Sequence, residues 1–295
     1  MRAILRLAAM ATSPTTTPTH PNQIKSHRLA ILANQLRLYK APPSPLDASA
    51  SDDDAPVVDA RGKVFSPMAV AESSAPPTLA RPDRFHSKTA AVLICLFEDS
   101  RGDLRVILTK RSSNLSTHSG EVSLPGGKTE EGDRDEKETA LREAKEEIGL
   151  EPSLVSVVTT LEPFLSKNEE TIGLHLCLQN SRDIRCVLQH LLRVKPVIAI
   201  LDDHDAFKPV LNPSEVEEIF DAPLEMFLKD ENKSSEERNW MGVKYLVHFF
   251  DYNTEGKRFM IWGLTAGILI RAASVVYQRP PSFMEQSPEY KTPYP

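Results

Sequence analysis

Three glutamates stand close together in one segment of the chain, at Glu143, Glu146 and Glu147. Residues three and four apart lie on one face of an α-helix, so a helix here would project the three carboxylates together. Like charges at these spacings destabilise a helix unless a cation neutralises them. Mg²⁺ takes oxygen ligands and is usually held by one or two carboxylates together with substrate phosphates. The pattern therefore indicates either a divalent-metal site or a solvated acidic face.

Glycines on both sides of this acidic helix favour the metal site. A tight turn is predicted at Pro125-Gly126-Gly127, before the helix, and Gly149 follows the helix. Only glycine enters many turn conformations freely, so the glycine pair would fix the geometry of the turn. The adjoining arc of the helix is apolar, which predicts packing on a core through Ala140, Leu141, Ala144 and Ile148.

The segment from residue 127 to residue 150 resembles the signature of the Nudix hydrolases, G-x5-E-x7-R-E-U-x-E-E-x-G-U, in which U is aliphatic. Gly127 matches the first glycine, and the second half is matched by Arg142, Glu143, Ala144, Glu146, Glu147, Gly149 and Leu150. There are two departures. Asp133 stands at the position of the first glutamate, and one extra residue separates it from Arg142. Both departures are similar to the shifted motif of the coenzyme A diphosphatase branch.

A second motif supports that branch. Residues 108–127, LTKRSSNLSTHSGEVSLPGG, resemble the additional motif of the coenzyme A diphosphatases, although an arginine expected near Leu115 is absent. The resemblance implies that Arg111 and His118 bind substrate. His118 has two interpretations, as a contact to substrate phosphate or as a brace of its loop. Arg111 and Lys110 are the nearest basic side chains that could bind the 3′-phosphate of coenzyme A.

The resemblance implies an α/β fold, the Nudix α/β/α sandwich with a mixed sheet between helices. It implies hydrolysis of the diphosphate bond of coenzyme A and acyl-coenzyme A esters, with Mg²⁺ or Mn²⁺ as cofactor. The products would be 3′,5′-ADP and 4′-phosphopantetheine species. One alternative is a Nudix hydrolase of ADP-ribose, NADH or an oxidised nucleotide. The other is a catalytically silent coenzyme A-binding or scaffold protein.

The resemblance also assigns roles to the acidic helix. Glu143, Glu146 and Glu147 would be the catalytic metal ligands. Arg142 and Asp133 belong to the catalytic set, and Arg142 is expected to pair with Asp133. That pair would hold the helix in register with the glycine turn.

Two further positions complete the expected site. The backbone of Gly126 and Gly127 would contact the substrate. Glu215, much later in the chain, is either an additional metal ligand or the general base, or else an ordinary acid favoured by a helix N-terminus.

Composition and charge limit the class of protein. The chain has 295 residues, of which 40% are hydrophobic and 26% charged, as in a globular protein of one large or two small domains. A net charge of −6 argues against a dedicated nucleic-acid binder. No run reaches the ~18 apolar residues that a membrane span needs. The expected partner is therefore a small-molecule substrate, and a homodimer is left open.

Cysteine usage points to a reducing compartment. Cys95, Cys177 and Cys186 have no metal-ligand spacing, and an odd, sparse set predicts no disulfide framework. Cys95 lies in an apolar run and is expected in the core.

Composition also divides the chain into segments. Residues 1–25 are basic and rich in Ser, Thr and Pro, which is typical of an organellar transit peptide. Residues 26–84 would hold an amphipathic helix and then a Pro-, Ser- and Asp-rich extension. Residues 85–278 are the expected Nudix domain, and residues 279–295 an expected disordered tail.

The transit-peptide composition predicts a mitochondrial protein, with chloroplast, peroxisome and cytosol as alternatives. The peroxisomal alternative rests on one short pattern. Arg28-Leu29, followed after five residues by Gln35-Leu36, resembles a peroxisomal N-terminal signal.

Residues 168–189 interrupt the resemblance. A structureless insertion of this length is unusual inside a compact domain. We interpret it as the product of splice variation or of a retained intron, which could silence an otherwise complete site.

Hydrophobic periodicity places the remaining elements. Strands are predicted at residues 90–98, 104–109, 154–161, 192–201, 244–252 and 258–262. A short helix is predicted at residues 223–228, and a mainly apolar helix from about residue 261 to residue 277.

Overall fold

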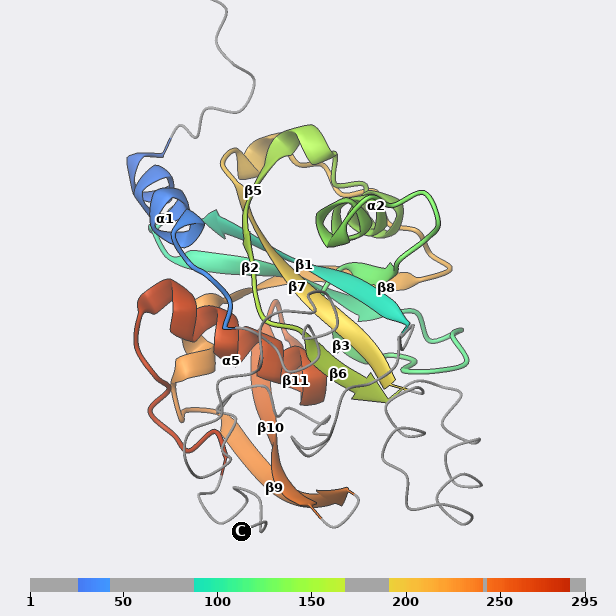
Figure 1. Ribbon diagram of the computed structural model, residues 1–295, viewed down its shortest axis with the longest axis vertical. Coiled ribbons are helices and arrows are strands. Elements are labelled where there is room, and N and C mark those ends of the chain that lie inside the picture. Colours follow the sequence, from blue (N-terminus) through green and yellow to red (C-terminus); the bar gives the residue numbers. More distant parts are fainter. Residues whose placement is uncertain (1–25, 43–87, 168–190, 241–242, 287–295) are drawn as a thin grey trace, which may run out of the picture.

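A computed structural model gives the fold of residues 26–42, 88–167, 191–240 and 243–286 (Figure 1). The α-helices are α1 (His27–Arg37), α2 (Glu136–Ile148) and α5 (Gly263–Tyr277). The short 3₁₀ helices are η1 (Pro152–Leu154), η3 (His204–Ala206) and η4 (Leu224–Leu228). The strands are β1 (Thr89–Glu98), β2 (Leu104–Arg111), β3 (Val122–Ser123), β4 (Gly126–Lys128), β5 (Val155–Thr160), β6 (Phe164–Lys167), β7 (Leu191–Leu201), β8 (Val216–Pro223), β9 (Lys233–Trp240), β10 (Val243–Thr254) and β11 (Lys257–Trp262). The predicted transit peptide and the insertion at residues 168–189 lie outside the described residues.

A mixed sheet of eight strands lies at the centre of the described fold. Its main path runs β3-β2-β1-β7-β5, while β4 pairs with β1, β6 with β7 and β8 with β2. The two central strands, β1 and β7, are parallel, and the pairs around them are antiparallel. The predicted hairpin of β1 and β2 is present, with Leu96 opposite Val106.

Both faces of the central strands are buried, because helices cover both sides of the sheet. Leu93 and Cys95 of β1 pack in the core beneath α2, whereas Ile94 and Leu96 belong to the core on the opposite side. Strands buried on both faces read as continuous apolar runs, as this one does. Figure 1 shows α2 over one face of the sheet and α1 and α5 over the other. The predicted α/β/α sandwich with a mixed sheet is confirmed.

Strands β9, β10 and β11 form a second, antiparallel sheet. This sheet shares the α5 core, where the ring of Phe250 lies 5.1 Å from that of Phe227 in η4. The β9 segment, KSSEERNW, has no apolar alternation, so its sequence does not predict a strand. The strand forms because β10 offers it a full ladder of backbone partners.

Helix α1 packs into the core of the domain rather than standing apart in an extension. Ser26 caps the helix by accepting a hydrogen bond from the Leu29 amide, and Leu29, Ala33 and Leu36 are buried against the α5 side. Beyond the helix, the Tyr39 hydroxyl donates to Glu162 at 2.7 Å. The predicted amphipathic helix is confirmed, and it belongs to the same folding unit as the sheet.

This packing involves the residues that resemble a peroxisomal signal. Leu29 and Leu36 are 2% and 1% exposed, and the Gln35 side-chain amide donates to the Val276 carbonyl of α5. Arg28 pairs with Glu98 at 3.1 Å. In the folded protein, therefore, the spacing of this pattern reflects the contacts that hold α1 in place.

The prediction of a disordered tail from Arg279 onward is wrong for residues 279–286. Arg279 pairs with Glu225 at 2.8 Å, and the Ser282 amide donates to the Leu228 carbonyl. The Gln286 side chain both accepts from and donates to the backbone of Leu246. Proline content predicts disorder here because it cannot reveal these contacts with the second sheet. Residues 287–295 lie outside the described residues.

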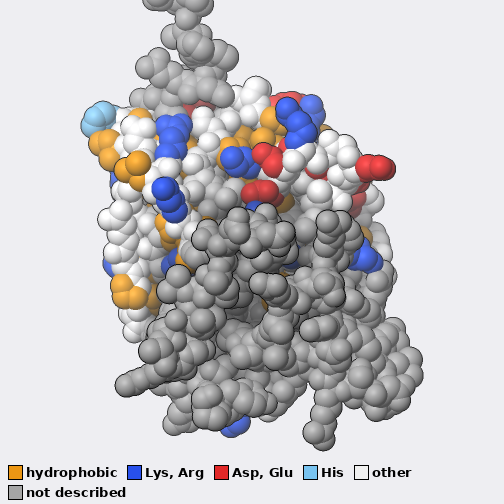
Figure 2. All heavy atoms as spheres, viewed as in Figure 1, with side chains coloured by type: hydrophobic (Ala, Val, Ile, Leu, Met, Phe, Trp, Pro, Cys, Tyr) orange, Lys and Arg blue, Asp and Glu red, His pale blue; other side chains and the backbone are white. Residues whose placement is uncertain are grey.

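Charge on the surface is mixed. On the face drawn in Figure 2, acidic and basic side chains are interspersed over the region where Figure 1 places α2. Within the described ranges, no helix is both long enough and apolar enough to cross a membrane.

Truncating Leu36 to Ala should lower the free energy of unfolding by about 2–5 kcal/mol, because a fully buried leucine leaves a cavity. Ile31 lies on the outer face of the same helix and is 55% exposed. Ile31→Ala should therefore change the free energy of unfolding by no more than about 0.5 kcal/mol. Urea unfolding of both variants measures the difference. Equal effects would show that α1 does not contribute its buried face to the core.

Candidate active site

Helix α2 carries the acidic residues and is bounded by two strong signals. The Asp135 side chain caps its N-terminus by accepting from the amides of Lys137 and Glu138. Gly149 ends it in the left-handed conformation, with φ 71°, which favours glycine. Its apolar arc is buried against the sheet through Ala140, Ala144 and Ile148. That packing fixes the rotation of the helix and so the direction in which the glutamates point.

Glu147 is the most deeply buried acid of the cluster, only 4% exposed. Its carboxylate accepts a hydrogen bond from the Gly126 amide at 3.1 Å. Burial raises the pKa of Glu147 to about 8, and the nearby charge of Glu143 adds to the rise. The Gly126 amide and the charge of Arg111 act in the opposite direction. A buried carboxylate so incompletely compensated favours the arrival of a cation.

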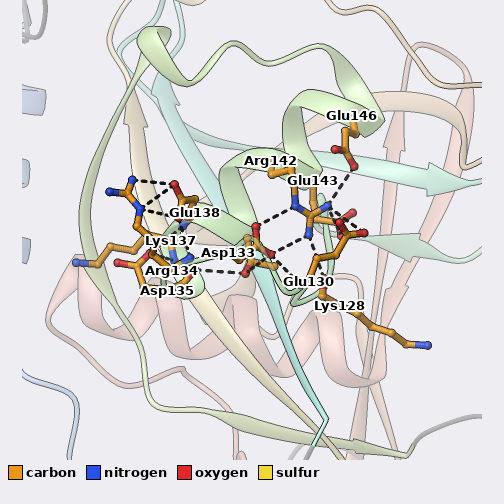
Figure 3. A network of polar contacts seen from close by, with 11 residues as sticks. Lys128, Glu130, Asp133, Arg134, Asp135, Lys137, Glu138, Arg142, Glu143 and Glu146 are labelled. Atoms are coloured by element: carbon orange, nitrogen blue, oxygen red, sulfur yellow. Dashed lines mark hydrogen bonds and ion pairs between the residues drawn. The ribbon is translucent and has the colours of Figure 1, made fainter.

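The other two predicted ligands share one arginine. Arg142 Nη1 lies 3.1 Å from a carboxylate oxygen of Glu143 and 3.2 Å from one of Glu146 (Figure 3). Burial raises the pKa of Glu143 despite this pairing. Glu146 is more open, with 55% of its side chain exposed. The structure thus places Glu143 beside Glu147 in the desolvated part of the site and Glu146 at its solvent edge.

The predicted pair of Arg142 and Asp133 is present and two-pronged. Arg142 Nε and Nη2 donate to the two oxygens of Asp133 at 3.1 and 3.0 Å (Figure 3). The guanidinium holds the pKa of Asp133 well below its usual range. Arg142 Nη2 also donates to the Lys128 carbonyl at 3.1 Å, which ties the helix to β4, the strand that contains Gly126 and Gly127. Asp133 is therefore a positioning residue, and the extra residue before Arg142 leaves this pairing intact.

Thr139 belongs to the same network, and sequence reasoning missed it. Its hydroxyl donates to Asp133 at 2.9 Å, and the residue is fully buried. A threonine next to the apolar arc of the helix, six residues after the acid, is the only signal that the sequence carries.

The tight turn predicted at Pro125-Gly126-Gly127 is wrong for the two glycines, because both lie in strand β4 and pair with β1. They are required there for different reasons. Gly126 lies in β4, where a Cβ would overlap the backbone of Ala91 and Val92 in β1, so close strand approach excludes any side chain. A Cβ on Gly127 would instead overlap the carboxylate of Glu143. Gly126 therefore protects the sheet, whereas Gly127 leaves room for a predicted ligand.

Two basic residues of the second motif are already engaged. His118 Nδ1 lies 2.9 Å from Glu121 within the same loop, which favours a brace over a phosphate contact. The backbone of His118 has φ 52°, so the loop turns sharply at this residue. Lys110 Nζ donates to Glu217 at 2.7 Å. Both basic side chains are thus bonded to acids outside α2 and not to its glutamates.

Glu215 comes close to the acidic helix through tertiary structure. The interpretation as a helix N-terminal acid is wrong, because strand β8 follows it. The preceding segment lies along the end of α2, where the Asn212 amide donates to the Glu147 carbonyl at 2.9 Å. The charge of Glu215 raises the pKa of both Glu143 and Glu147. It is therefore a member of the acidic cluster.

The donor chemistry of this cluster suits a hard divalent cation. No three His, Cys, Asp or Glu side chains among the described residues are arranged to hold a metal ion as they stand. Glu143 and Glu146 contact Arg142 instead. However, several carboxylates converge here and two of them have raised pKa values, so a divalent cation would relieve both repulsion and desolvation. The residues fit such an ion once Glu143 turns from Arg142.

Gly127→Ala should weaken Mn²⁺ binding by roughly ten- to a hundredfold, because the added methyl displaces the Glu143 carboxylate. The obstacle is the end of a flexible side chain, so the thermal unfolding midpoint should change little. Gly132→Ala is the control, since nothing lies within 4 Å of a Cβ there. Titration with Mn²⁺ measures the effect. Unchanged Mn²⁺ affinity in Gly127→Ala would remove Glu143 from the ligand set.

Asp133→Asn should lower the free energy of unfolding at pH 7, because the amide cannot accept both prongs of Arg142. The pKa of Asp133 is depressed in the folded state, so its contribution is present above the unfolded value of about 3.9. That contribution is lost as pH falls toward the lower folded pKa. Urea unfolding at pH 7, 5 and 3 should therefore show the two proteins converging in acid. A constant difference would contradict the ion pair.

Comparison with known proteins agrees with this geometry. The NUDIX domain family matches residues 87–241. The chain is 64% identical over 232 residues to Nudix hydrolase 15, mitochondrial, of Arabidopsis thaliana, which covers 79% of this chain and 73% of that protein. It is 54% identical over 290 residues to Nudix hydrolase 22, chloroplastic, of the same plant, and the match covers 97% of this chain and 84% of that protein.

A more distant relative carries a more specific name. The peroxisomal coenzyme A diphosphatase NUDT7 of Mus musculus is 32% identical over 184 residues, covering 62% of this chain and 68% of that protein. The family match spans more than half of the chain, and the plant relatives align over most of it. On this evidence, the chain belongs to the Nudix family of hydrolases.

Proposed function

We propose that this Nudix hydrolase splits the diphosphate bond of coenzyme A and of acyl-coenzyme A esters. The observation that carries the proposal is the convergence of Glu143, Glu147 and Glu215 beside the Gly126 amide. Such a face suits a diphosphate held through a divalent cation. The motif at residues 108–127 and the name of the mouse relative support coenzyme A as the ester. The plant relatives are named only as Nudix hydrolases.

The reaction adds one water across one phosphoanhydride bond. The water oxygen bonds to phosphorus, the bridging P–O bond breaks, and a proton is released. Coenzyme A then yields 3′,5′-ADP and 4′-phosphopantetheine, each ending in a phosphate monoester. The barrier is electrostatic, because the negative oxygens of a diphosphate repel an incoming nucleophile.

Different residues of the chain would hold the cation, position the helix and accept the proton. Glu143 and Glu147, with Glu146 at the edge, would hold Mg²⁺ or Mn²⁺, which when bound neutralises phosphate oxygens and acidifies water. Arg142, fixed by Asp133, holds α2 against β4. The Gly126 amide orients Glu147. Glu215 is half-buried and has no hydrogen-bonded or ionic partner for its carboxylate among the described residues, so it is our candidate for accepting the proton.

We further propose an organellar location, in mitochondria. The transit-peptide composition of residues 1–25 and the names of the two plant relatives, one mitochondrial and one chloroplastic, support an organelle. The peroxisomal alternative is supported by the name of the mouse relative, and the burial of Leu29 and Leu36 in the core is our reason for placing it second.

Purified full-length protein with Mg²⁺ should release 3′,5′-ADP from coenzyme A, and removal of the metal with EDTA should abolish release. Glu147→Gln should lower kcat by at least about a hundredfold while the protein stays folded. Glu151→Gln is the control, since this acid lies just beyond the helix and pairs with Lys145. Chromatography of the products measures turnover.

The same assay separates the alternatives. Turnover of ADP-ribose, NADH or 8-oxo-dGTP, with coenzyme A untouched, would place the enzyme elsewhere in the family. No turnover of any of the four would favour a silent binding protein. Normal turnover by Glu147→Gln would refute the metal assignment.

A further inference from the structure

The guanidinium of Arg111 forms no hydrogen bond or ion pair in the described part of the chain. Its Nε atom is buried without a hydrogen bond, and none of its guanidinium nitrogens forms an ion pair there. Two other partly buried arginines of the fold are paired with a carboxylate, Arg105 with Asp221 and Arg271 with Glu162. Charges withdrawn from water are normally paired, so an unpaired guanidinium marks a place for an anion.

The backbone holds Arg111 firmly at the end of β2. Its amide donates to the Glu121 carbonyl at 2.9 Å, and its carbonyl accepts from the Gly120 amide at 3.2 Å. The next amide, of Ser112, donates to the Glu215 carbonyl at 2.8 Å. Pairing with β8 shifts register between Lys110 and Arg111, where one residue of β8 is skipped. Bulges of this kind occur beside active sites, where they redirect a side chain.

Arg111 lies on the side of β2 that faces the acidic cluster. Arg111 lies four residues after Ile107, whose side chain is in the core beneath α2, so both fall on the same face of β2. The amide of the next residue, Ser112, is bonded to the carbonyl of Glu215, which places the end of β2 beside a member of the acidic cluster. Lys110, the neighbouring basic residue, is turned to Glu217 instead.

We propose that Arg111 binds the oxygens of the substrate diphosphate itself, facing them across the site from the carboxylates of α2. The proposal rests on the proposed function in taking a diphosphate ester as substrate. A guanidinium offers two parallel donors to phosphate oxygens and stays charged at every working pH. Arg111 therefore supplies the positive charge on the side away from the metal ligands. The 3′-phosphate of coenzyme A is left to other residues.

Methylenediphosphonate, a diphosphate analogue that water cannot split, tests this assignment. Calorimetric titration of full-length protein with this probe and Mg²⁺ should show binding weakened roughly ten- to a hundredfold in Arg111→Gln. Arg111→Lys should fall between Gln and the wild type, because it keeps the charge but not the two-pronged geometry. Arg258→Gln is the matched control, an exposed arginine of β11 that is paired with Asp251.

Titration with Mg²⁺ alone separates substrate binding from a merely structural role of Arg111, because loss of structure at the site would weaken Mg²⁺ binding as well. Arg111→Gln should bind Mg²⁺ at least as tightly as the wild type, because a positive charge has left the metal site. Wild-type affinity for the probe in Arg111→Gln would overturn the proposal and leave Arg111 as a counter-charge for Glu147. If Arg111→Gln does not fold, Arg111→Lys serves as the test variant. Wild-type affinity of Arg111→Lys for the probe would then overturn the proposed two-pronged contact.

The outcome is independent of which ester the enzyme hydrolyses. The probe carries no base, ribose or pantetheine, so loss of its binding in Arg111→Gln supports the assignment for any diphosphate substrate. Failure of coenzyme A turnover would refute the proposed substrate and leave this result standing.

Discussion

Mutual repulsion among the carboxylates at one end of α2 is the constraint on which the site depends. Glu143 and Glu147 are withdrawn from water and face Glu215, so burial and like charge both raise their pKa values. The fold supplies only partial compensation, through Arg142 and the Gly126 amide. The remaining imbalance is what makes this face receptive to a hard divalent cation and, through it, to a diphosphate.

Such a cluster persists only on a rigid support. Helix α2 is fixed by its buried arc of alanines and Ile148 on β1 and β7, two strands covered on both sides. Gly126 lets β4 approach β1 without a side chain between them, which places its amide at Glu147. The Arg142–Asp133 pair then ties the helix to the loop before it. Loss of any of these supports would move the glutamates relative to β4.

The folding unit extends beyond the residues that define the family. The family match ends at residue 241, and it begins at residue 87, after α1. Yet α1 and α5 contribute buried leucines and alanines to the same core as the sheet. The buried Glu162–Arg271 ion pair joins them, since Tyr39 donates to Glu162 and accepts from Arg271. The segment after α5 continues this wrapping along β10.

The sequence alone determined the catalytic helix and the sandwich, because helical spacing and continuous apolar runs are local signals, but it predicted a turn where the two glycines form strand β4. It also predicted the Arg142–Asp133 pair, although only by resemblance. Tertiary structure decided the rest. Glu215 joins the cluster because the segment before β8 lies along α2, and Arg111 reaches it because the end of β2 is bonded to that same segment. β9 is ordered by pairing with β10, the next strand of the chain, and the tail is ordered by contacts with the more distant β10 and η4. The resemblance named Arg111 and Glu215 as candidates, but contacts between remote segments leave no periodic trace, so no local pattern could place these two side chains at the acidic helix.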